Sequence, residues 1–205
     1  MKVYKYTSVE YVKSAIENGI YASELTNFND PYEYEGIEYL EDYRACCLTK
    51  SPLKMLMWSY YGNHKGCCVE FKVPDNLNII KDVTYTKDYY QHRDMSGDEI
   101  YENLYKKAYE WKHENETRIA YYTPKADKKL WKVIDNNIFF KAPVSKVMFG
   151  MRVDMNEDNI RQLLTFLKET NDKNDDNIKV VKCMLENKRY ALKENKQFKY
   201  TKHIL

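Results

Sequence analysis

The sequence predicts an α+β fold, with a mixed, mostly antiparallel sheet and several short helices. Three observations support this. Stretches with the periodicity of strands and of helices follow one another in mixed order, without the regular alternation of a doubly wound sheet. The 205 residues, 43% of them hydrophobic, suffice for the core of one domain. The six glycines form neither a Gly-x-Gly-x-x-Gly nor a Walker A pattern. We expect a single domain over 1–205, with a helical insertion at about 88–112 and a basic tail at 193–205.

Strands are predicted where apolar and polar residues alternate, or where a short apolar run lies between turn residues. Such segments are found at 3–7, 20–23, 45–49, 67–73, 78–86, 118–122, 139–140, 144–149, 178–185 and 189–192. The last two are expected to form a hairpin around Asn187.

Helices are predicted at 8–19, 51–60, 96–111 and 154–170. Ser51 and Pro52 suit the N-cap and first position of the second helix. Ser96 and Glu99 form a capping-box sequence for the third, and apolar residues at helical spacing extend it to Trp111. Residues 27–31 form a turn, because Asn and Asp bond their own backbone and Pro fixes φ.

The composition excludes several classes of protein. A balance of 33 Lys and Arg against 31 Asp and Glu excludes a strongly basic duplex-binding protein. No apolar run approaches the 18 or so residues of a membrane span. The first residues lack the apolar stretch of a signal peptide, so we expect a cytoplasmic protein that does not associate with membranes.

The five cysteines indicate free thiols and no metal site. Cys46 and Cys47 are adjacent, as are Cys67 and Cys68, while Cys183 stands alone, and a zinc site would need Cys-x-x-Cys or similar spacing. Since neighbouring strand residues point to opposite faces, we expect only one member of each pair to face the core.

The segment from Trp111 to Arg118 is the first candidate for chemistry. Its Glu114-x-Glu116 spacing, at the entry to a strand, would place two carboxylates on one face, where their mutual repulsion separates their pKa values. Such a pair can divide acid–base roles or stabilise an oxocarbenium-like centre. The alternative interpretation is two solvated glutamates, one of which pairs with Arg118 or Lys112.

The segment 57–66 is the second candidate. Its aromatic residues at a helix end can line a pocket that stacks a flat ring, and His64 can transfer a proton or contact a phosphate near neutral pH. The alternatives are a core anchor for Trp58 and a simple polar turn at 62–66. The third candidate combines 4–8 with Asn29 and Asp30, which form either a rigid turn or a loop that presents them to a ligand.

Taken together, these segments resemble an uncharacterised bacterial family, domain of unknown function 2971, over almost the whole chain. The likeness rests on the spacing of the motifs Tyr4-Lys5-Tyr6, Ile20-Tyr21-Ala22-Ser23, Phe28-Asn29-Asp30-Pro31, Met57-Trp58-Ser59-x-Tyr61-x-x-His64-Lys65-Gly66, Trp111-x-x-Glu114-x-Glu116-x-Arg118 and Val147-Met148-Phe149-Gly150. It departs at Tyr60, where the family pattern has a histidine.

The chain also resembles the ADP-ribosyltransferase superfamily more loosely, in the strand Gly19-Ile20-Tyr21-Ala22-Ser23 and in Glu114-x-Glu116. This resemblance implies a split sheet and a reaction on NAD in which Glu116 is the key carboxylate. Glu114 and His64 are its further catalytic candidates. The residues implied for binding the dinucleotide are Tyr4, Lys5, Tyr6, Asn29, Asp30, Trp58, Ser59, Tyr61, Lys65 and Arg118.

The leading hypothesis is therefore an NAD-using ADP-ribosyltransferase or NAD glycohydrolase of a bacterial or phage conflict system, acting without metal on a protein or nucleic-acid acceptor. A second hypothesis is a protein that binds or processes nucleotides or nucleic acids, with His64, Lys65 and Arg118 on phosphate. A third is a non-catalytic interaction module with an exposed apolar patch. The enzyme hypothesis requires Glu116, segment 57–66 and the first strand to meet around one cleft.

Overall fold

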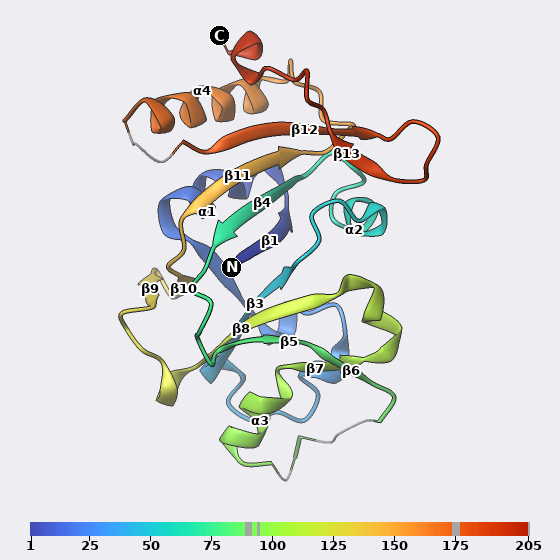
Figure 1. Ribbon diagram of the computed structural model, residues 1–205. Helices are drawn as coiled ribbons and strands as arrows, with labels where there is room; N and C mark the ends of the chain where they lie inside the picture. Colours follow the sequence, from blue (N-terminus) through green and yellow to red (C-terminus); the bar gives the residue numbers. More distant parts are fainter. Residues whose placement is uncertain (89–91, 94, 174–176, 205) are drawn as a thin grey trace. The chain divides into compact units, whose positions relative to one another are not determined.

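A computed structural model describes residues 1–88, 92–93, 95–173 and 177–204. Two compact units are formed by alternating stretches of the chain. Unit 1 contains Met1–Gly19, Ser51–Val73 and Ala142–Leu205, and unit 2 contains Ile20–Lys50 and Pro74–Lys141. Both helices and a mixed, mostly antiparallel sheet are present, as Figure 1 shows, so the predicted α+β class is confirmed. No helix among the described residues is long and apolar enough to cross a membrane.

Unit 1 is built on strands in the order β13-β12-β11-β4-β1. Their bounds are β1 Lys2–Thr7, β4 Cys67–Lys72, β11 Val144–Phe149, β12 Lys179–Leu185 and β13 Leu192–Glu194. Its helices are η1 Val9–Tyr11, α1 Val12–Asn18, α2 Met55–Tyr60, α4 Asp158–Lys173 and η7 Tyr200–His203. The pair β11–β12 is parallel and joined through α4, whereas the other pairs are antiparallel. The predicted closing hairpin is present as β12 and β13.

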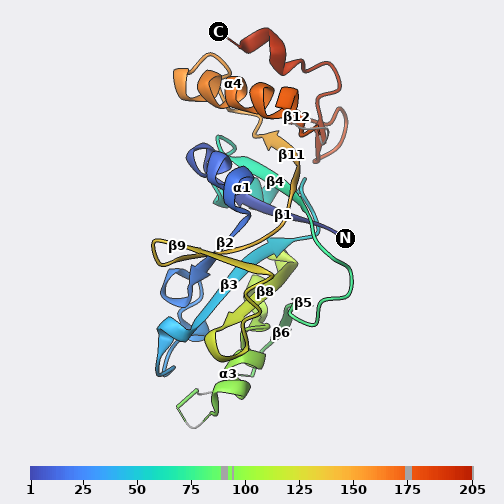
Figure 2. The same cartoon turned by 90° about the vertical axis from the view of Figure 1, so that its left-hand side faces the viewer.

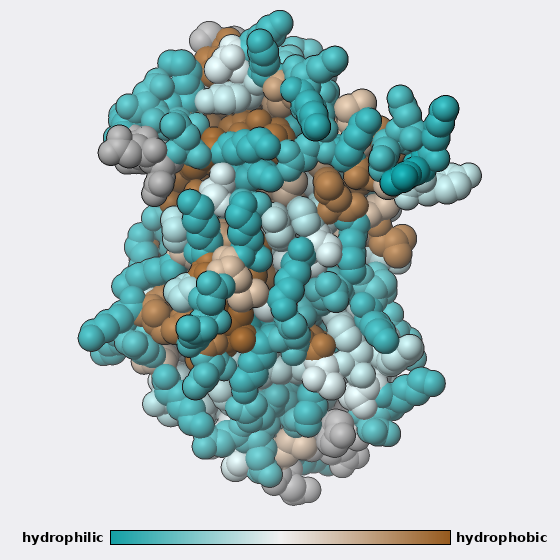
Figure 3. All heavy atoms as spheres, viewed as in Figure 1, coloured by the Kyte–Doolittle hydropathy of each residue, from teal (hydrophilic) through white to brown (hydrophobic). Residues whose placement is uncertain are grey.

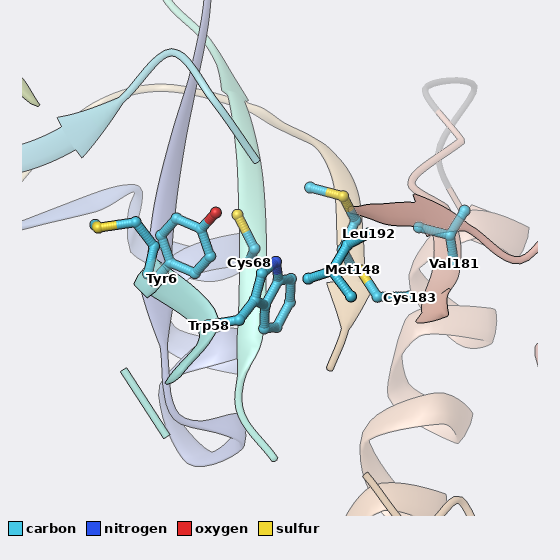
Figure 4. Packing of buried hydrophobic residues seen from close by; sticks show 8 residues of the cluster. Tyr6, Trp58, Cys68, Met148, Val181, Cys183 and Leu192 are labelled. Atoms are coloured by element: carbon cyan, nitrogen blue, oxygen red, sulfur yellow. The ribbon is translucent and has the colours of Figure 1, made fainter. Parts of the chain in front are cut away.

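Both faces of the unit 1 sheet are covered. On one face, side chains from β1, α2, β4, β11, β12 and β13 form an apolar cluster around Trp58 (Figure 4). Helix α1 packs against β4 and β11 and contacts α4 (Figure 2). Cys67 and Cys68 are therefore both fully buried, and the expectation that only one of them would face the core is wrong.

Unit 2 contains strands in the order β5-β8-β3-β2-β10-β9, all antiparallel. Their bounds are β2 Ile20–Glu24, β3 Tyr43–Thr49, β5 Ile80–Asp82, β8 Glu116–Tyr122, β9 Trp131–Ile134 and β10 Asn137–Phe140. A separate parallel pair joins β6 Thr84–Thr86 to β7 Lys106–Ala108. The helices are η2 Leu25–Asn27, η3 Pro31–Glu33, η4 Leu40–Asp42, α3 Gly97–Asn103, η5 Tyr109–Glu114 and η6 Thr123–Lys125.

Three predicted helices differ from the structure. The helix expected at 154–170 is α4, which begins at Asp158. Helix α2 begins at Met55, with extended Lys54 as its N-cap, so Ser51 and Pro52 do not open it. Helix α3 has the predicted Ser96–Glu99 capping box but ends at Asn103. The residues up to Trp111 instead enter β7 and a 3-10 helix, because Lys106–Ala108 pairs with β6. Residues 89–91 and 94 of the predicted insertion, and residue 205 of the tail, lie outside the described residues.

Candidate functional site

The sequence-predicted site residues lie in two groups, one in each unit. Unit 1 holds Tyr4, Lys5, Tyr6, Trp58, Ser59, Tyr61, His64 and Lys65. Unit 2 holds Asn29, Asp30, Glu114, Glu116 and Arg118.

In unit 1, the Trp58 indole belongs to the core. It is fully buried, its Nε1–H donates a hydrogen bond to the Pro52 carbonyl at 2.9 Å, and the Tyr6 ring packs against it edge-on at 5.2 Å. The Tyr6 hydroxyl donates to the Ser51 carbonyl at 3.0 Å. These contacts agree with the core-anchor interpretation of Trp58, since the ring has no exposed face for a ligand.

The loop after α2 in unit 1 holds His64 in an unusual conformation. Gly62, Asn63 and His64 have φ values of 110°, 49° and 63°, so three successive residues are left-handed. The His64 side chain is buried, and burial together with the charge of Arg152 lowers its pKa. The lowered pKa favours the neutral imidazole, so this side chain offers less positive charge to a phosphate. Ser59, Tyr61 and Lys65 are exposed.

In unit 2, the first candidate segment meets Asn29 and Asp30 of the third, whereas residues 4–8 of the third lie in unit 1. The Asn29 amide donates to Glu114 Oε1 at 2.9 Å, and its carbonyl oxygen accepts from Lys107 Nζ at 2.7 Å. The Asp30 carboxylate accepts from the backbone N–H of Tyr32 at 3.1 Å, which explains the predicted turn. Glu114 belongs to η5 and not to the strand, and Asn115 between the two glutamates is left-handed.

Glu116 is held by Arg118, two residues later on β8. Nε and Nη2 of Arg118 donate to the two carboxylate oxygens at 2.8 and 2.9 Å, a bidentate pair. Arg118 is fully buried, its Nη1 donates to the Leu104 carbonyl at 2.6 Å, and its guanidinium lies 4.9 Å from the centre of the Phe28 ring. Glu116 itself is only 6% exposed.

Two further residues complete the arrangement, and sequence reasoning missed both. Lys107 Nζ lies 2.6 Å from Glu114 and 3.6 Å from both Glu33 and Glu116. Glu33 also pairs with Arg118. We call Glu33, Lys107, Glu114, Glu116 and Arg118 the ion cluster. No sequence pattern distinguishes these two residues, because Glu33 lies in an acidic stretch and Lys107 is one of many lysines in the chain.

The fold shifts the pKa values of two cluster carboxylates in opposite directions. Burial raises the pKa of Glu33, and the opposing charges of Arg118 and Lys107 do not fully offset it. Burial also acts on Glu116, but the charge and hydrogen bonds of Arg118, the charge of Lys107 and a hydrogen bond from Cys47 outweigh it and bring its pKa to about 2. Carboxylates with separated pKa values can divide acid–base roles.

The charges of the ion cluster explain this division. Its ion pairs join three carboxylates to two cations, which leaves one negative charge in surplus (3 − 2 = 1) when every group is ionised. A proton on Glu33 would bring the cluster to neutrality. Since unpaired charge is expensive to bury, the raised pKa of Glu33 means that it takes up a proton more readily than Glu116.

A pocket of about 540 Å³ in unit 2 reaches the ion cluster. Glu33 and Lys107 belong to its lining, together with Asp30, Tyr32, Lys87 and Lys106 among others. Glu114, Glu116 and Arg118 do not line it. Within the described part of the chain, no group of three His, Cys, Asp or Glu side chains has an arrangement suited to a metal ion.

The comparisons with known proteins leave the resemblances as predictions. No protein-family model matches the sequence, and searches of curated proteins and of solved structures found no significant match.

Proposed function

We propose that this protein cleaves NAD, as a transferase of ADP-ribose or an NAD glycohydrolase, and that the ion cluster and pocket of unit 2 are its site. The observation that carries the proposal is that Glu33 and Glu116 share Lys107 and Arg118 while their pKa values are shifted apart, and that one of them lines a pocket.

The chemistry fits a buried surplus of negative charge. When the bond between ribose C1′ and nicotinamide breaks, nicotinamide leaves with the electron pair as a neutral molecule, and positive charge develops on the ribose. A preorganised negative field nearby stabilises this state. Arg118 fixes Glu116 in its ionised form, so the cluster supplies its surplus charge without reorganisation at the moment of reaction.

Nicotinamide release from NAD by the purified protein tests this proposal, with Glu116→Gln beside the wild type. We expect release by the wild type and a loss of about 10²–10³-fold in the variant, because Gln keeps the size and removes the charge. Glu41→Gln, at an exposed position of unit 2, is the matched control and should retain the wild-type rate. Absence of release, together with absence of NAD binding by calorimetry, would contradict the proposal.

A second candidate function is nucleotide binding without chemistry. It is favoured by Lys87 and Lys106 of the pocket lining, which lie outside the ion cluster and offer positive charge to phosphate groups. NAD binding without nicotinamide release, unchanged in Glu116→Gln, would support this alternative over cleavage.

A further inference from the structure

The pocket in unit 2 brings one carboxylate of the ion cluster within reach of a ligand. The Glu33 side chain is 5% exposed, that of Lys107 is 3% exposed, and both contribute to the pocket lining. Glu33 is placed there by η3, which begins at Pro31 and is capped by Asp30. Helix η3 contacts β7, the strand that carries Lys107. Glu33 thus links the ion cluster to the pocket.

We propose that Glu33 accepts the proton of the group that attacks the ribose, and that the pocket above it receives this acceptor, a water molecule or an alcohol. This inference rests on the proposed NAD cleavage. It assigns the activation of the acceptor to a residue that neither the Glu-x-Glu motif nor the family resemblances indicate.

The step balances in atoms and charge. The acceptor oxygen forms a bond to C1′ as the C1′–nicotinamide bond breaks and nicotinamide leaves with its electron pair. The acceptor O–H proton passes to the Glu33 carboxylate. Protonation of Glu33 removes the surplus negative charge of the ion cluster. The two carboxylates that stay ionised then balance its two buried cations. Glu33 returns its proton to water for the next turnover.

The pH dependence follows from the groups that face Glu33. Arg118 and Glu116 face it from β8 and Lys107 faces it from β7. The other charged or titratable side chains of the pocket lining are those of Asp30, Tyr32, Lys87, Asp88, His92, Lys106 and Glu110. Glu33 accepts a proton only when it is ionised. The rate should therefore rise with pH through the pKa of Glu33, which burial places above 4.5.

The test measures nicotinamide release against pH for the wild type, Glu33→Gln and Glu33→Ala, with formate as the probe and Glu41→Gln as control. We expect Glu33→Gln to lose about 10²-fold or more and to lose the wild-type rise with pH. Formate should restore part of the rate in Glu33→Ala, because a small carboxylate can occupy the space left by the side chain. Circular dichroism confirms that each variant is folded.

The outcomes separate this inference from the function on which it rests. No release by the wild type overturns both. Wild-type release with an unchanged rate and pH profile in Glu33→Gln overturns the inference alone. A slower Glu33→Gln that keeps the wild-type pH profile, or a slow Glu33→Ala that formate does not restore, shows a structural role and also overturns it.

Discussion

At the scale of single residues, the ion cluster shows how a protein keeps five charges away from water. Burying a charge costs several kcal/mol unless partners compensate it. Here Arg118 binds both oxygens of Glu116, and Lys107 is shared by Asn29 and three carboxylates. Glu33 pairs with these same two cations, and its pKa is raised because burial outweighs them.

Two substitutions in the cluster should affect stability very differently. Glu116→Gln removes the bidentate partner of a fully buried arginine and should lower the free energy of unfolding by about 3–5 kcal/mol. Glu33→Gln leaves two carboxylates against two cations, a balanced cluster, so we expect a loss of about 1 kcal/mol or less. Urea unfolding at pH 7 measures both. Equal losses in the two variants would show that the bidentate hydrogen bonds between Arg118 and Glu116 do not set the difference between them.

The sequence motifs indicate all of this arrangement except Glu33 and Lys107. Asn29, Glu114, Glu116 and Arg118 belong to the predicted motifs, and the structure brings them together. Lys107 was not selected, because its role depends on the parallel pairing of β7 with β6, and no local pattern predicts that pairing.

At the scale of elements, close backbone contacts fix the loop 62–66 of unit 1. Gly150 N–H donates to the Gly66 carbonyl at 2.9 Å, and Arg152 N–H donates to the His64 carbonyl at 3.0 Å. A Cβ on Gly150 would lie 2.1 Å from that His64 oxygen, which is backbone and has no flexible end to move away. The backbone that follows β11 thus holds the loop that contains the left-handed residues 62–64.

Gly150→Ala should therefore destabilise unit 1 by about 1–3 kcal/mol, the range typical of overpacking. Thermal unfolding followed by circular dichroism measures the effect. Lys65→Ala, at an exposed position of the same loop, serves as control and should unfold at the wild-type temperature. An unchanged unfolding temperature for Gly150→Ala would mean that the loop moves away without cost.

Local signals predicted most strands and helices, and the exceptions have physical causes. Strand β9 was missed, although Asp135 and Asn136, both left-handed, form a two-residue hairpin turn between it and β10. Helix α2 begins at Met55, later than its capping sequence suggests. The Pro52 carbonyl accepts a hydrogen bond from the Trp58 indole, and residues 51–54 precede the helix.

At the scale of the whole molecule, the mixed order of elements predicts the α+β class. It does not predict the division of the chain into two units. The chain alternates between them in five stretches, three in unit 1 and two in unit 2, and no change of composition marks the crossings. On the face shown in Figure 3, hydrophilic side chains predominate, and hydrophobic residues reach the surface near α2 and the β12–β13 hairpin, where Leu56 and Leu185 are exposed.

The separation of the Glu33 and Glu116 pKa values is a property of the folded chain, since both side chains titrate near the ordinary 4.5 in an unfolded chain. Carbon-13 NMR of the glutamate carboxyl carbons over pH 2–8 measures it most directly, with Glu33→Gln and Glu116→Gln to assign the two signals. We predict that the Glu33 signal titrates above 4.5 and that the Glu116 signal stays ionised down to about pH 2. Titration of both near 4.5 would contradict the division of roles from which the function is inferred.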